Sequence, residues 1–265
     1  MSVLLSLCLT TIVAFGQGPK VGDRLPVTIE VAESPAQQLL HCEKLIQRLA
    51  AVPENRRVVA GLEILANLDV VQKVWPTNAE AVLQSYLLKD EVSRQCGMTG
   101  NAREALLKAV PLSKRTSYEP IVDMRLGQVY DRLGDRAAAE QHFKSAEQSV
   151  HRVDVSPQTA ASVLSASAFF YHNQDRPRDA MRAYRAAANW KKQSDVLAAN
   201  YLLASLKEAV TIKESDARAE AKRDVDAIGA AITAGRKTAK RAEDQAALTR
   251  IELEANRIRT RHNVH

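Results

Sequence analysis

The sequence contains few of the residues that interrupt helices. Its 265 residues include 10 glycines and 9 prolines, and only 5% of them are aromatic. No proline follows Pro177, and no aromatic residue follows Tyr201. Alanine, leucine, arginine, glutamate and lysine are abundant instead, and these residues lose little conformational freedom in a helix. The composition therefore predicts an all-α fold.

The sequence also lacks the local motifs of the common enzyme classes. It contains no GxSxG, HExxH, P-loop or GxGxxG pattern. Among its six histidines, only the terminal pair, His262 and His265, has the three-residue or four-residue spacing of helical metal ligands. We therefore predict no catalytic residues, no metal, no cofactor and no enzymatic activity.

Cysteine is scarce, with three residues in the whole chain and no CxxC pair. Cys8 lies in an apolar N-terminal run, and Cys42 and Cys96 lie in two different predicted helices. In an exported protein these two could form a disulfide. The alternative, two buried thiols, fits better with the place of Cys96 in the repeat described below.

The first residues form an apolar run that is too short to cross a membrane as a helix. Residues 3–15 carry no charge and end in Ala14-Phe15-Gly16, a small-x-small pattern before Gln17. A spanning helix needs about 20 apolar residues. We expect a signal peptide over residues 1–16 and a linker over 17–33. Cleavage would give a periplasmic or extracellular protein, and without it the chain would be cytoplasmic or membrane-associated.

The positive charge is modest and mixed with negative charge. The formal net charge is +6, from 37 lysines and arginines against 31 aspartates and glutamates. From residue 211 onward the balance is twelve basic to nine acidic residues, so the C-terminal segment is not a polybasic arm. This pattern argues against a nucleic-acid partner, which would require basic residues gathered on one face.

A spacing of small and large residues recurs along the chain. Ala105, Ala139 and Ala180 each follow a larger residue by nine positions, and the units are offset by 34 and then 41 residues. Small residues at such spacing let two antiparallel helices pack closely, and periods of this length predict a stacked helical array. The larger residues are Cys96, Tyr130 and Tyr171.

Helix-start signals divide the chain further. Ser34-Pro35 and Ser156-Pro157 place an N-cap before a first-turn proline. We predict a helical repeat domain over 34–212, whose first hairpin covers 35–68. Three further capping boxes are expected at Thr77 with Glu80, Asn101 with Glu104, and Thr116 with Glu119.

The remaining segment, 213–265, is rich in alanine and charged residues. Val225, Ile228 and Ile232 form an apolar stripe at helical spacing. We expect a partly exposed helical tail, which could mediate self-association.

Residues 123–146, DMRLGQVYDRLGDRAAAEQHFKSA, resemble a tetratricopeptide repeat (TPR). The unit at 161–187 is similar, with Asp175 in place of the turn glycine, and the unit at 86–112 is a third, more distant match. The resemblance implies a right-handed superhelical solenoid of antiparallel hairpins. The packing residues that it implies are Leu126, Gly127, Tyr130, Ala139, Phe143, Ala146, Ala168, Tyr171, Ala180 and Tyr184.

In the TPR family the first helix of each hairpin lines a concave groove. Three consecutive aromatics, Phe169 to Tyr171, cannot all face one side of a helix, so Phe169 either projects into the groove or packs on a neighbouring hairpin. The resemblance implies a scaffold or adaptor that binds a peptide or protein in this groove. The alternative is a structural component that assembles through its C-terminal helices. The groove candidates are Arg94, Gln128, Asp131, Arg132, Phe169, His172 and Asn173.

Overall fold

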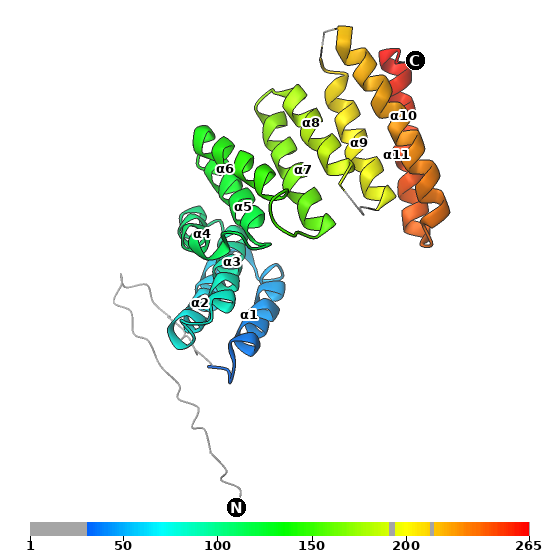
Figure 1. The fold of residues 1–265 in the computed structure, drawn as a ribbon. Helices are drawn as coiled ribbons and strands as arrows, with labels where there is room; N and C mark the ends of the chain where they lie inside the picture. Colours follow the sequence, from blue (N-terminus) through cyan, green and yellow to red (C-terminus); the bar gives the residue numbers. More distant parts are fainter. Residues whose placement is uncertain (1–30, 191–193, 213–214, 265) are drawn as a thin grey trace, which may run out of the picture. The chain divides into compact units, whose positions relative to one another are not determined.

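The computed structural model describes residues 31–190, 194–212 and 215–264. Over these residues the chain forms eleven α-helices and no strand, which confirms the predicted all-α class (Figure 1). The predicted signal peptide and the linker up to residue 30 lie outside the described residues. The helices are α1 (Pro35–Leu49), α2 (Glu54–Val74), α3 (Ala79–Gln95), α4 (Thr99–Ser113), α5 (Glu119–Arg132), α6 (Arg136–Ser149), α7 (Pro157–Asn173), α8 (Pro177–Ala188), α9 (Asp195–Ala209), α10 (Ser215–Thr238) and α11 (Ala242–His262).

The chain divides into two compact units, Met1–Lys114 and Arg115–His265. Helices α1 to α4 form the described part of the first unit, and α5 to α11 that of the second. The boundary lies inside the range predicted as one repeat domain. No helix in the described parts of either unit is both long enough and apolar enough to span a membrane.

In the first unit, α1 packs against α2 and α3, and α3 packs against α4. Helix α1 begins as predicted, because the backbone N–H of Gln37 donates to Ser34 Oγ at 3.3 Å. Helix α3 begins one residue later than predicted: Asn78, not Thr77, accepts a bond from the N–H of Ala81 at 3.0 Å. A side-chain amide oxygen caps a helix as well as a hydroxyl does, so the two adjacent candidates could not be separated by residue type.

Cys42 and Cys96 are both free thiols in this unit. Cys42 is fully buried, and this burial raises its pKa to about 11. Cys96 is half-buried, and its Sγ donates to the backbone carbonyl of Arg57 at 3.3 Å. The structure thus has the arrangement of two unpaired thiols rather than a disulfide.

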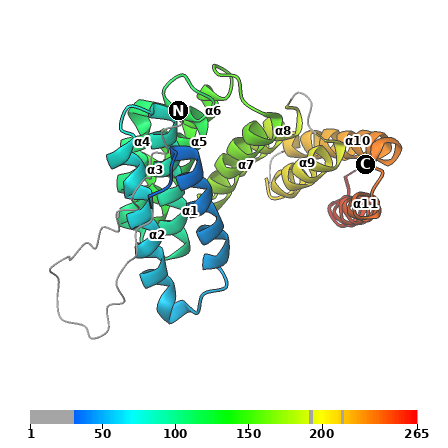
Figure 2. The ribbon, with the colours of Figure 1, turned by 90° about the horizontal axis from the view of Figure 1, so that it is seen from below.

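The second unit is a row of antiparallel hairpins. Helices α7, α8, α9 and α10 lie side by side in chain order (Figures 1 and 2). Helix α7 begins as predicted, because the N–H of Thr159 donates to Ser156 Oγ at 3.0 Å. At the start of α5 the N-cap position is held by Tyr118 rather than by the predicted Thr116; the Glu119 carboxylate accepts from the N–H of Arg115 at 2.9 Å, and Thr116 Oγ1 accepts from the N–H of Tyr118 at 3.2 Å.

The C-terminal segment is helical, as predicted, and both of its helices pack on α9. Helix α10 packs along α9, and α11 packs against both. The side chains of Ile228, Ile232, Leu248 and Ile251 are buried in a core shared with α9. The predicted apolar stripe of α10 is the face that enters this core, but a single amphipathic helix does not reveal which neighbour covers it.

A buried ionic network fixes α10 to the rest of the second unit. Arg185 on α8 donates from Nε to Asp224 Oδ1 at 2.7 Å and from Nη1 to Glu220 Oε2 at 2.9 Å. Ser205 on α9 donates to Asp224 Oδ2 at 2.7 Å. Asp224 is only 2% exposed, so three helices are held together through one carboxylate that lies away from water.

The hairpin at 119–149 shows why its small residues are needed. Gly127 and Ala139 are buried where α5 crosses α6. A Cβ added to Gly127 would lie 2.9 Å from Cδ2 of Phe143, closer than a carbon contact allows. Every packing residue that the TPR resemblance implied is buried or half-buried in the structure.

The register of the first repeat differs from the sequence interpretation. In three hairpins the first helix ends with the same turn, in which a backbone N–H donates to the carbonyl oxygen five residues earlier. The residues that accept this bond are Ser93, Tyr130 and Tyr171. Ser93, not Cys96, is therefore the equivalent of the two tyrosines, and the first offset is 37 residues rather than 34. The turn residue is Gly97, which takes the left-handed conformation with φ of 70°, whereas Gly100, next to the predicted cap Asn101, lies within α4.

Helix α4 accordingly begins at Thr99, with Met98 at the N-cap position instead of the predicted Asn101. Two glycines three residues apart are equally able to end a helix, so only the packing of α4 on α3 decided between them.

Candidate functional site

The exposed aromatic residue predicted from the run of three lies on α7. Phe169 is 60% exposed, whereas Phe170 and Tyr171 are 2% and 1% exposed. Successive helical residues point about 100° apart, so burying two of the three leaves the third on the surface. Phe170 stacks on Phe143 with ring centroids 4.8 Å apart. The Phe169 side chain is thus exposed on α7.

A histidine–glutamate pair lies beside this ring. His172 Nδ1 is 2.8 Å from Glu208 Oε1, and the pair joins α7 to α9. The imidazole is largely exposed, and its centroid is 6.5 Å from that of Phe169. The Glu208 side chain is only 10% exposed, and this burial raises its pKa, an effect that His172 opposes. We call Phe169, His172 and Glu208 the α7–α9 surface.

The other groove candidates lie on three helices of the two units. Asn173 is exposed at the end of α7. Gln128 and Asp131 are half-buried on α5, and Arg132 is exposed there. Arg94 lies in the first unit, where its guanidinium pairs with Asp90 and Glu91 of its own helix. The sequence did not indicate Glu208, since 36 residues separate it from His172 and no local spacing connects the two.

A second polar cluster contains the residue types of a nucleophilic triad in a different arrangement. Ser145 Oγ donates to Asp123 Oδ2 at 2.6 Å, and His142 Nδ1 lies 3.0 Å from Asp123 Oδ1. A triad needs the hydroxyl bonded to the imidazole, with the carboxylate on the other ring nitrogen. Here one carboxylate binds both groups, and the imidazole stacks on Tyr130 with centroids 5.4 Å apart. The cluster fastens α6 to α5 and does not activate the serine.

A buried carboxyl group lies behind the aromatic run. Glu147 on α6 is near the hydroxyls of Ser167 and Tyr171, and burial raises its pKa although these hydroxyls oppose the effect. Glu140, on the same helix, has the opposite behaviour: hydrogen bonds from Lys144 and then Arg176 lower its pKa.

We expect Glu147→Gln to stabilise the folded protein at neutral pH. The folded chain holds the Glu147 proton at a higher pH than the unfolded chain does, where the glutamate pKa is about 4.3. The free energy of unfolding therefore falls as the pH rises from the unfolded-state pKa of Glu147 to its folded-state pKa. Above the folded-state pKa the cost of burying the ionised carboxylate is fully present. Urea melts from pH 4 to pH 8 should show a gain for the variant that shrinks toward acid. Glu140→Gln, as a control, should lose stability at neutral pH, and a gain for both variants would contradict this assignment.

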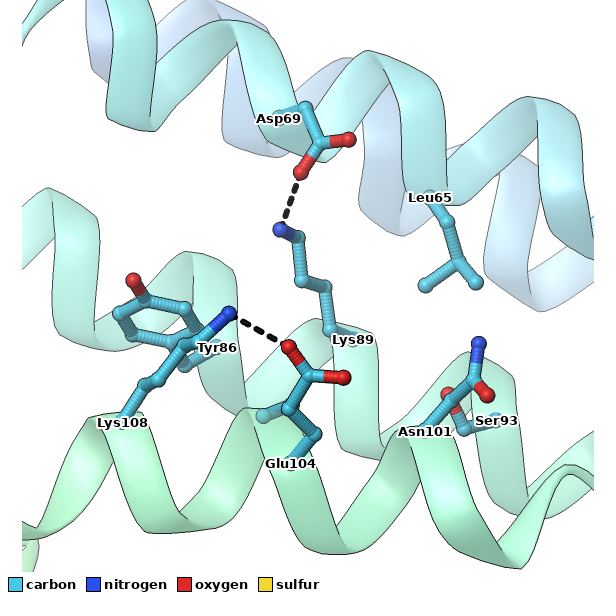
Figure 3. Close-up of a pocket in the computed structure, with 9 residues that line it drawn as sticks. Leu65, Asp69, Tyr86, Lys89, Ser93, Asn101, Glu104 and Lys108 are labelled. Carbon is cyan, nitrogen blue, oxygen red and sulfur yellow. Dashed lines mark hydrogen bonds and ion pairs between the residues drawn. The ribbon is translucent and has the colours of Figure 1, made fainter.

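The first unit contains a polar cleft of about 180 Å³ between α2, α3 and α4 (Figure 3). Lys89 extends from α3 across the cleft to Asp69 on α2, and Lys108 pairs with Glu104 on α4 at 2.6 Å. The remaining lining residues are Leu65, Tyr86, Ser93, Asn101 and Ala105. In the described part of the chain, no three histidine, cysteine, aspartate or glutamate side chains are close enough together to hold a metal ion.

No family model matches the sequence, and no curated protein matches it. Two solved structures are similar over most of their length. BtubC (BKLC) from P. vanneervenii shares 17% identity over 88% of this chain and 94% of that one, with a TM-score of 0.38. The DHF58 filament shares 13% identity over 86% of this chain and 94% of that one, with a TM-score of 0.23. Both likenesses are too weak to inform the function of this chain.

Proposed function

We propose that the protein is a non-enzymatic, TPR-like scaffold that binds a peptide or protein segment on the α7–α9 surface. The exposure of Phe169 is the observation that supports this most directly. A phenylalanine ring that is 60% exposed beside two buried aromatics leaves apolar area in water. Aromatic residues, phenylalanine included, are enriched in protein interfaces relative to the rest of the surface.

The neighbouring pair of His172 and Glu208 would fix the orientation of a segment that is bound at Phe169. Glu208 holds the His172 imidazole in place through the 2.8 Å contact between Oε1 and Nδ1. The other ring nitrogen, Nε2, is then available to a hydrogen-bonding group of a bound segment, next to the apolar ring. An apolar anchor beside a fixed polar group suits a peptide side chain followed by its backbone amide.

This proposal predicts that Phe169→Ala weakens peptide binding without unfolding the protein. Peptides selected from a random displayed library on the full chain should bind the variant at least about tenfold more weakly, as measured by fluorescence anisotropy. Since the ring is exposed, the thermal melt of the variant should match that of the wild type.

Leu107→Ala is the matched control, because Leu107 is 46% exposed on α4 in the other unit. It should leave the affinity of the selected peptides unchanged. Equal affinity of those peptides for the wild type and Phe169→Ala would overturn the assignment of the site.

Assembly through the C-terminal helices is the second candidate. Leu253 on α11 is 56% exposed, and it borders an open groove of about 630 Å³ between α9 and α11. This supports a contact made by the surface of α11 rather than by a detached tail. A constant molecular mass in light scattering over a wide concentration range would exclude self-association by this route.

A further inference from the structure

The cleft in the first unit lies at the position that a tyrosine fills in the later hairpins. The shared turn bond makes Ser93 the equivalent of Tyr130 and Tyr171. The following helices agree with this register: Ala102, Leu106 and Ala109 of α4 are buried, as are their equivalents 37 residues later on α6. Two of three hairpins therefore place a phenol ring where the first places a hydroxymethyl group.

Tyr171 shows what this position normally holds. Its ring is 1% exposed, and the guanidinium of Arg176 lies over it, 4.8 Å from the centroid. Its hydroxyl faces Glu147 on α6, the last helix of the preceding hairpin. At Tyr171 the phenol thus has a cation over the ring and a carboxyl group near the hydroxyl.

The cleft around Ser93 has the same chemical elements but no ring. Asp69 supplies the carboxylate from α2, which is the last helix of the hairpin that precedes α3 and α4. Lys89 Nζ lies 5.5 Å from the centroid of Tyr86, which shows that this cation already stacks on an aromatic ring at the edge of the cleft. Leu65, Ser93 and Asn101 line this cleft together, with Leu65 on a different helix from the other two (Figure 3).

Ser93 itself indicates a missing partner. The residue is fully buried and lines the cleft, and its Oγ has no hydrogen-bond partner among the described residues. A buried hydroxyl without a partner destabilises the folded chain, because it has lost its hydrogen bonds to water and gained none in return. A ligand that brings a hydrogen-bonding group into the cleft would remove this cost.

We propose that the cleft between α2, α3 and α4 binds a phenol group, with the ring between Leu65 and Ala105 and the hydroxyl bonded to Ser93 or Asp69. A polypeptide could present this group as a tyrosine side chain, or it could arrive as a small free phenol. The site belongs to the first unit, so its test does not depend on Phe169 or on the peptide-binding proposal.

The test uses p-cresol, the free form of the tyrosine side chain, titrated into the full chain and followed by NMR. We expect saturable binding that shifts the signals of residues around the cleft. Ser93→Tyr fills the cleft with the protein's own ring and should weaken p-cresol binding at least about tenfold. Ala105→Leu narrows the same space and serves as a second blocking variant if Ser93→Tyr does not fold.

Two controls separate this site from general association with the surface. Ser162→Tyr adds the same ring at an exposed position on α7 and should leave binding unchanged. Toluene should bind the wild type more weakly than p-cresol, and Ser93→Ala should reduce this preference. Binding that does not saturate, or that persists at full strength in both blocking variants, overturns the proposal.

N-acetyltyrosinamide distinguishes the two sources of the phenol. Affinity equal to or above that of p-cresol supports a tyrosine presented by a polypeptide, because the backbone atoms are then accommodated. Affinity about tenfold lower supports a small free phenol as the ligand.

Discussion

Replacing Asp224 with alanine is expected to destabilise the second unit by about 3–5 kcal/mol, the cost of breaking a buried ion pair by removing one partner. The variant leaves the Arg185 guanidinium without its bond to Asp224, and it leaves Ser205 Oγ without the acceptor that lies at 2.7 Å in the wild type. Arg185 keeps its two bonds to Glu220, at 2.9 and 3.0 Å, so the loss should stay within that range.

The measurement is chemical denaturation followed by circular dichroism, with Asp226→Ala as the matched control. Asp226 is an exposed aspartate two residues further along α10, and its replacement should change stability by less than about 0.5 kcal/mol. Since Asp224 connects α8, α9 and α10, hydrogen exchange should also become faster in all three helices. A loss below about 1 kcal/mol for Asp224→Ala would show that this network does not hold α10 in place.

The second large effect is expected from a methyl group at the crossing of α5 and α6. Gly127→Ala places a Cβ 2.9 Å from Cδ2 of Phe143, whose ring is buried and stacked on Phe170. Overpacking of this kind costs about 1–3 kcal/mol, more than the gain of about 0.5–1 kcal/mol that alanine brings to a helix interior. We therefore expect a net loss of stability.

Gly229→Ala is the matched substitution with the opposite expected sign. Gly229 also lies within a helix of the second unit, but a Cβ added there meets nothing within 4 Å. This variant should gain about 0.5–1 kcal/mol. Thermal and urea melts of both variants give the comparison, and a gain of similar size for both would contradict the close approach of the two helices.

Much of the fold could be predicted from local patterns. Ser34-Pro35 and Ser156-Pro157 start helices where predicted, and Ser156 Oγ accepts the expected bond at 3.0 Å. These features depend on residues within one helical turn, so the sequence contains all the information that they need. The stripe at Ile228 and Ile232 likewise identified a helix with one buried face.

The candidate sites were less predictable, because they join residues that are far apart in the sequence. Phe169 could be found from the run of aromatics, but its exposure depended on which two of the three rings fit between α6 and α8. Glu208 and Asp69 could not be found, since each meets its partner on a different helix. The cleft at Ser93 depended on a three-residue shift of register that only the turn at Gly97 revealed.

The succession of amphipathic helices with small residues at the crossings follows from the order of amino acids alone, because helix propensity, capping and periodicity are local properties. That the C-terminal helices pack on α9 and that Ser93 takes the place of a tyrosine became visible only in the packed helices. Those outcomes depend on which helix faces pack against each other. Side-chain packing and the burial of charged groups, as at Asp224, determine these contacts.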